Sequence, residues 1–203
     1  MANPAPESEN PTQSQVLELL GRSLYVCNSI ELMIRWMNIH RGGFWTGKTQ
    51  EKLFESVKKT VEKRQKEDKR MLGLVGPGLI DAIYTPPCNK KIDAAEKKSL
   101  FACQMDLKVK RKGRHRQALA KFKKFTDARN YLVHYFARDY SLETPELCQK
   151  AFSDLRKKGI IIQDAFNFFR EDYTMIIQLW KDFKNSLPKL FEPGVTENPA
   201  ARS

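Results

Sequence analysis

Apolar side chains recur at steps of three and four residues along most of this 203-residue chain, which is the period of a helix buried on one face. No segment sustains the two-residue alternation of a half-buried strand. The pattern predicts an all-α fold, an antiparallel bundle of about five to six helices. A chain of this length buries one core, so we expect a single domain over 13–191 between flexible, polar tails at 1–12 and 192–203.

Residues that start and stop helices divide this pattern. Gly42 and Gly43 can end a helix, and Thr144-Pro145 is typical of an N-cap followed by proline at the first helical position. We interpret the apolar run at 159–162 as the entry to the last helix and not as a strand. The predicted helices span residues 13–40, 49–70, 93–110, 114–140 and 144–158, and a last one that continues to about 187.

Glycine and proline interrupt the helical pattern between the second and third of these helices. Residues 73–91 carry turn-forming dipeptides, so we expect a loop with at most a short helix at 79–84. The wider segment 68–112 is loop-rich and basic, and we interpret it as an insertion into the helical domain.

Charge and cysteine usage narrow the class of protein. Lysine and arginine number 36 against 24 aspartates and glutamates, a formal net charge of +12 that favours polyanionic partners such as nucleic acid or an anionic membrane. The chain shows neither a stretch long enough to cross a bilayer nor an export signal, so we expect a cytoplasmic protein with no membrane partner. Cys27, Cys88, Cys103 and Cys148 lie singly, which predicts reduced thiols and no metal site.

The string at 42–49 matches the phosphate-binding loop pattern G-x-x-x-x-G-K-[ST], which raises the hypothesis of a nucleotide triphosphatase. That loop follows a buried β-strand in nucleotide-binding proteins, whereas here it follows a long amphipathic helix and contains two bulky aromatic residues. We interpret it as a connection between helices, in which Gly42 ends one helix and Thr46 or Thr49 caps the next.

An arginine followed five positions later by a histidine occurs twice, as Arg35 with His40 and as Arg129 with His134. The spacing alone is weak evidence for a site, because a chain rich in arginine shows it by chance. The surroundings differ. Arg129 is followed by polar Asn130 inside a predicted helix, whereas His40 falls at a helix end, so we favour the second pair.

From Arg129 the sequence reads Arg-Asn-Tyr-Leu-Val-His-Tyr-Phe and resembles the HEPN superfamily, small helical bundles whose ribonucleases carry Arg-x(4–6)-His. In the first helix, Leu20-Gly21-Arg22-Ser23-Leu24 leads to Glu31 as in many relatives. The resemblance implies a HEPN-like bundle with metal-independent endoribonuclease activity and no cofactor, a toxin or defence effector that cleaves RNA by attack of the ribose 2′-hydroxyl. It also implies a homodimer whose motif helices share one cleft, and an antitoxin protein as partner.

The candidate catalytic residues are Arg129, Asn130 and His134, with Glu31 in support. Histidine titrates near neutral pH and suits a general acid or base, whereas a guanidinium stays charged and can stabilise phosphate. On a helix Arg129 and His134 lie about 140° apart, while Asn130 and His134 share a face, so the amide can orient the imidazole or bind ribose. Glu31 falls within an apolar stripe, where a carboxylate needs a partner, and Arg129 is the expected one.

Nine basic residues and no acidic one fall within 108–124, a candidate phosphate track for RNA. Two alternatives remain open. Arg129 and Glu31 can form only a structural ion pair, or the chain can be a non-catalytic helical module that binds RNA or a protein. The candidate RNA-binding residues are Lys108, Lys110, Arg111, Lys112, Arg114, Arg116, Lys121, Lys123 and Lys124.

Overall fold

The computed structural model describes residues 10–67, 78, 80, 81, 83, 84, 101–105 and 113–189. Most of these residues are helical, as predicted, and 78, 80, 81, 83 and 84 agree with the short helix expected there. None of the helices within these ranges combines the length and apolar character that a bilayer crossing requires. Most of the expected tails and of the 68–112 insertion lie outside the described residues. The helices are α1 (Gln13–Ile39), α2 (Gln50–Glu67), α4 (Arg114–His134), α5 (Phe136–Asp139) and α6 (Pro145–Lys189).

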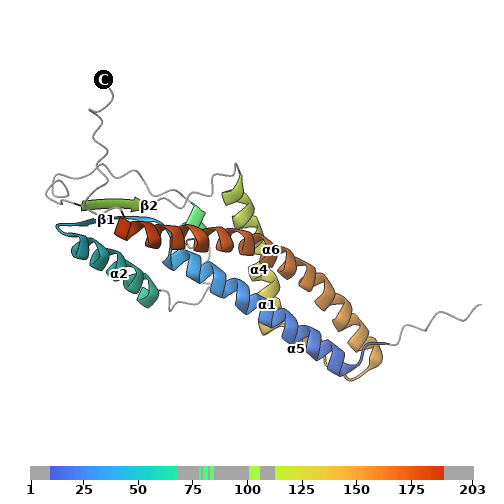
Figure 1. The fold of residues 1–203 in the computed structure, drawn as a ribbon. Coiled ribbons are helices and arrows are strands. Elements are labelled where there is room, and N and C mark those ends of the chain that lie inside the picture. The colour runs from blue at the N-terminus through green and yellow to red at the C-terminus, as the bar shows by residue number, and fades with distance from the viewer. Residues whose placement is uncertain are drawn as a thin grey trace, which may run out of the picture.

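Helices α1 and α6 lie side by side along the length of the molecule (Figure 1). Later residues of α1 contact later residues of α6. Trp36 packs edge to face with Tyr173, and His40 packs in the same way with Trp180, with ring centroids 5.3 Å apart in each pair. The two helices are therefore parallel, as the first and third helices of a bundle are when each helix reverses the direction of the one before.

Helix α4 runs antiparallel to α6. Its first residue, Arg114, contacts Asp172, whereas Tyr131 near its end lies against Lys158, earlier in α6. Because α1, α4 and α6 alternate in direction along the chain, the first and third of them must point the same way. The core between these three helices is closed by large, fully buried side chains, including Ile30, Ile34, Phe125, Leu155, Ile162, Phe169 and Ile176.

Helix α6 is continuous over 45 residues, where the sequence pattern predicts two helices that meet near position 159. It begins as predicted, because the Thr144 hydroxyl accepts a hydrogen bond of 3.3 Å from the Leu147 amide. The helix continues through Gly159, and Leu155 and Ile162 on either side of this glycine are both buried in the core. Burial of two such side chains outweighs the cost of roughly 1 kcal/mol for one glycine in a helix.

A two-stranded antiparallel ribbon joins β1 (Gly43–Gly47) to β2 (Phe101–Met105) beside α2 (Figure 1). The sequence pattern predicts a loop for the first strand and part of the 93–110 helix for the second, so both predictions are wrong over the described residues. Trp45 anchors the ribbon, because its indole is buried and lies 5.8 Å from the ring of Phe183 in α6.

We expect Gly159→Ala to raise the free energy of unfolding by about 0.5–1 kcal/mol, because alanine loses less backbone entropy in a helix and a Cβ meets no atom there. Gly113 is the matched contrast. A Cβ there also meets open space, but its φ is 81°, so Gly113→Ala should lower that free energy by about 1–2 kcal/mol. Urea unfolding measures both, and a loss of stability in Gly159→Ala would contradict an uninterrupted α6.

Candidate active site

Arg129 of α4 and Glu31 of α1 form an ion pair in which Nε of the arginine donates to Oε1 at 3.0 Å. This confirms the pairing expected from the position of Glu31 in an apolar stripe. The Glu31 side chain is 17% exposed and the Arg129 side chain 32%. The carboxylate therefore fixes the guanidinium between two helices, while part of the guanidinium remains open to solvent.

Asn130 holds a second nitrogen of the same guanidinium. Nη1 of Arg129 donates to Oδ1 of Asn130 at 3.3 Å. The described residues give Nη2 no hydrogen-bond partner. An arginine held at Nε and Nη1 with Nη2 open can bind an anion without first reorganising.

His134 is the last residue of α4, where the sequence pattern places it inside a helix that continues to 140. The regular helix stops at Tyr135, whose φ is −119° and whose amide still donates to the Tyr131 carbonyl at 3.0 Å. Leu132 and Phe136 are both buried and hold the backbone on either side. His134 is consequently directed outward and is exposed, as a residue that exchanges protons with a substrate must be.

The structure brings Arg129, Asn130 and Glu31 together, but within the described residues it shows no contact between Arg129 and His134. Five positions of helix separate the two directions by about 140°. A substrate that touches both groups must span this surface, or a second copy of the chain must supply one of the two.

The other arginine–histidine pair has its histidine in a packing role. His40 caps the end of α1, stacks on Trp36 with ring centroids 4.0 Å apart, and places Nδ1 2.9 Å from the Trp36 carbonyl oxygen. Burial lowers the pKa of His40, which favours the neutral ring in this aromatic setting. His40 is therefore accounted for by packing at the end of α1, and the choice of Arg129 and His134 stays a prediction.

Arg114 is buried, and its assignment as an RNA-binding residue is wrong. Only 8% of it is exposed, and Nη2 lies 2.9 Å from Asp172 Oδ1 and 3.1 Å from Glu171 Oε2. The guanidinium carbon also lies 3.7 Å from the centre of the Phe168 ring. The Tyr84 hydroxyl donates to Asp172 at 2.5 Å, and burial together with this carboxylate raises the pKa of Tyr84 above its usual range. These contacts enclose the charge of Arg114 inside the fold.

The other predicted RNA-binding residues divide into three groups. Arg116, Lys123 and Lys124 are exposed on α4, whereas Lys121 forms an ion pair with Asp164 of α6. Lys124 lies about 15 Å along the helix axis from the end of α4, so this surface stays a candidate RNA track at a distance from the motif. The predicted residues that lie outside the described part of the chain are Lys108, Lys110, Arg111 and Lys112.

The string that matches a phosphate-binding loop is a strand followed by a helix. Residues 43–47 are extended and paired with β2, so their backbone amides do not converge on one point as a bound phosphate requires. A Cβ on Gly47 would clash with the backbone of Leu53, which explains this glycine by packing. The Thr49 hydroxyl accepts a hydrogen bond from the Lys52 amide at 3.3 Å, which confirms the predicted cap.

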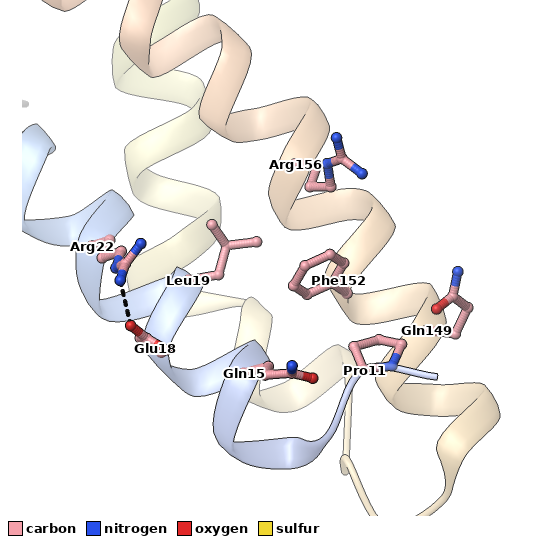
Figure 2. Close-up of a pocket in the computed structure, with 8 residues that line it drawn as sticks. All are labelled: Pro11, Gln15, Glu18, Leu19, Arg22, Gln149, Phe152 and Arg156. Carbon is pink, nitrogen blue, oxygen red and sulfur yellow. Dashed lines mark hydrogen bonds and ion pairs between the residues drawn. The ribbon is translucent and has the colours of Figure 1, made fainter. Parts of the chain in front are cut away.

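A groove of about 470 Å³ lies between the first halves of α1 and α6 (Figure 2). Figure 2 shows Leu19 and Phe152 between the two helices and the bond between Glu18 and Arg22 along α1. The α1 residues that line it lie roughly half a turn around the helix from Glu31, so the groove opens on another side of the molecule from the motif.

The described cysteines are buried, free thiols, as expected for Cys27 and Cys148. Burial, reinforced by the nearby Glu31 carboxylate, raises the pKa of the Cys27 thiol to about 12, so it has little nucleophilic character. The predictions for Cys88 and for the Cys103 side chain lie outside the described residues. In the part of the chain that the structure describes, no group of three or more histidine, cysteine, aspartate or glutamate side chains is placed to hold a metal ion.

Comparison of this chain with protein-family models, with curated proteins and with solved structures finds no match. The resemblance to the HEPN superfamily therefore depends on the chain's own residues, Arg129, Asn130 and His134 with Glu31 opposite.

We expect Arg114→Ala to lower the free energy of unfolding by about 3–5 kcal/mol, because it leaves the buried Asp172 carboxylate without its cation. Arg116→Ala, two positions away and exposed, should change it by no more than about 0.5 kcal/mol. Chemical unfolding of both variants measures the difference. Equal stability of the two variants would mean that the Arg114 side chain is not enclosed.

Proposed function

We propose that this chain is a cytoplasmic, metal-independent endoribonuclease of HEPN type, a toxin or defence effector with an antitoxin protein as its partner. The observation that carries the proposal is the ion pair between Glu31 and Arg129, 3.0 Å long, which holds a partly open guanidinium on the same helix as an exposed histidine. The net charge of +12 supports RNA as the substrate.

In the proposed reaction His134 accepts the proton of a ribose 2′-hydroxyl while that oxygen attacks the adjacent phosphorus. The bond from phosphorus to the 5′ oxygen breaks, the leaving oxygen takes up a proton, and a 2′,3′-cyclic phosphate remains. Arg129 stabilises the charge that develops on the non-bridging oxygens through the nitrogen that Glu31 and Asn130 leave open. Asn130 lies one turn before His134 on the same face and orients the imidazole or the ribose.

We also propose that the active form is a homodimer. Tyr25 and Leu32 share one exposed apolar face of α1, about 100–120° around the helix from Glu31, and Val133 is exposed one turn after Arg129 on α4. Exposed apolar side chains on the two helices that carry the motif suit a self-complementary contact between two copies. Such a contact would bring His134 of one copy to the phosphate held by Arg129 of the other. The angle of about 140° between the two residues on one helix would then no longer separate them.

We expect His134→Ala to reduce RNA cleavage by roughly 10² to 10⁴, because general acid or base catalysis contributes about that much. The assay uses total RNA in EDTA with mapping of the product ends, and cyclic phosphate termini are expected from the wild type. His115→Ala is the matched control, since His115 is also on α4 but is bound to Asp81 at 2.8 Å, and it should cleave normally. Undiminished cleavage by His134→Ala would reject the proposal, and RNA binding without cleavage by the wild type would favour the non-catalytic module.

A mixture of Arg129→Ala and His134→Ala proteins should recover activity that neither has alone. If each site combines the two copies, half of the dimers are mixed and each mixed dimer keeps one intact site, so roughly a quarter of the wild-type rate is expected. Leu32→Asp, which places a charge in the proposed contact, should abolish the recovery and yield monomers in sedimentation. No recovery from a mixture shown to contain mixed dimers would place the whole site within one chain.

A further inference from the structure

An aromatic and cationic cluster adjoins His134 at the junction of α4 and α5. Tyr135 is 43% exposed, and its ring meets the His134 ring edge to face with centroids 6.3 Å apart. The guanidinium carbon of Arg138 lies 4.8 Å from the centre of the same Tyr135 ring, and the Tyr131 ring lies 6.5 Å away at a tilt of 31°. We call Tyr131, Tyr135 and Arg138 the Tyr135 platform.

The fold holds this platform in place. The Tyr135 carbonyl accepts hydrogen bonds from the amides of Arg138 and Asp139, at 3.0 Å and 2.9 Å, so the turn into α5 is fixed. Tyr131 is held by Lys158, whose Nζ lies 4.7 Å from the ring centre. Burial and a hydrogen bond with Tyr140 raise the pKa of Tyr131 above its usual range, so this residue stays neutral. A platform that is ordered before binding loses little entropy when a ligand stacks on it.

The Tyr135 ring is exposed although it contacts His134 and Arg138. Its hydroxyl makes no hydrogen bond to the residues that the structure describes, while Leu132 and Phe136 do the packing on this turn. Arg138 is 69% exposed at its side chain and pairs with Asp139 at 3.0 Å, which leaves its guanidinium plane accessible. Lys158 adds a cation on the neighbouring helix.

We propose that the Tyr135 platform is a binding subsite for an unpaired nucleobase of single-stranded RNA, next to the scissile phosphate. The inference rests on the proposed function, and it adds the class of substrate. Aromatic rings and arginine planes are the groups on which proteins stack splayed bases, and a base inside a duplex cannot reach such a surface. With the base on Tyr135, the sugar-phosphate backbone of the same strand lies near His134 on one side and Lys158 on the other.

The first test measures binding of a single-stranded 2′-O-methyl oligonucleotide, which has no attacking hydroxyl and stays intact. Tyr135→Ala should weaken its affinity by roughly tenfold to a hundredfold, whereas Tyr135→Trp should keep it, because stacking on one aromatic side chain contributes about that much. Leu179→Ala is the matched control, since Leu179 on α6 is 41% exposed, and it should bind as the wild type does. Thermal unfolding establishes that all of these variants fold.

The second test replaces each base of the oligonucleotide in turn by an abasic residue and repeats the measurement with both proteins. An abasic residue at one position should weaken the affinity of the wild-type protein by the same factor as Tyr135→Ala does. The same abasic residue should not weaken the affinity of the Tyr135→Ala variant any further, which is the coupling expected of two groups in contact. The dependence of affinity on salt should be unchanged by Tyr135→Ala, because stacking neutralises no phosphate.

The outcomes separate the subsite from the proposed function. A wild-type protein that neither binds nor cleaves RNA overturns both. A protein that cleaves RNA in EDTA, but whose Tyr135→Ala variant binds as the wild type does, overturns the subsite alone. Loss of affinity in Tyr135→Phe as large as in Tyr135→Ala also overturns it, because the hydroxyl and not the ring would then be the binding group. Equal binding of duplex and single-stranded oligonucleotides contradicts an unpaired base.

Discussion

The arrangement of the motif depends on one constraint, the burial of a single apolar stripe along the 45 residues of α6. That stripe packs against α1 on one side and α4 on the other, so two helices separated by most of the chain's middle segment are held next to each other. Once they are, Glu31 and Arg129 lie within hydrogen-bonding distance although they are 98 positions apart. The chemistry of the candidate site is therefore a product of hydrophobic packing that involves none of its own residues.

Two arginines of α4 show how the same ion-pairing chemistry serves different purposes. Arg114 is enclosed by Asp172, Glu171 and the Phe168 ring, so its charge is neutralised where it lies. Arg129 has one carboxylate, one amide and an open side. A buried pair is often no more stable than apolar residues of similar size, so the ion pair of Arg129 is weak evidence of stabilisation, and it leaves one side of the guanidinium accessible.

Local sequence features predicted the parts of the fold that local physics decides. The first helix, the caps at Thr49 and Thr144, and the partner of Glu31 all follow from periodicity, from hydroxyl groups that accept amide protons, and from the cost of an unpaired carboxylate. The ribbon was not predicted, because its strands pair across 54 positions at Gly47 with Phe101 and 62 positions at Gly43 with Met105. A strand's preference for such pairing depends on its partner and not on local sequence. The burial of Arg114 was missed because the basic run was interpreted as one surface, although Arg114 lies four and eight positions before Ala118 and Phe122 on the apolar face of α4.

At the end of α4, buried and exposed residues alternate within one turn, because Leu132 and Phe136 are buried whereas His134 and Tyr135 are exposed. A helix that continued past His134 would keep side chains on a fixed rotation of about 100° per residue. The structure instead breaks the rotation at Tyr135, between buried Leu132 and buried Phe136. The two buried residues hold the backbone, and the residues between them are free to face outward. Positions 134 and 135 can therefore change without disturbing the core, because neither side chain is buried in it.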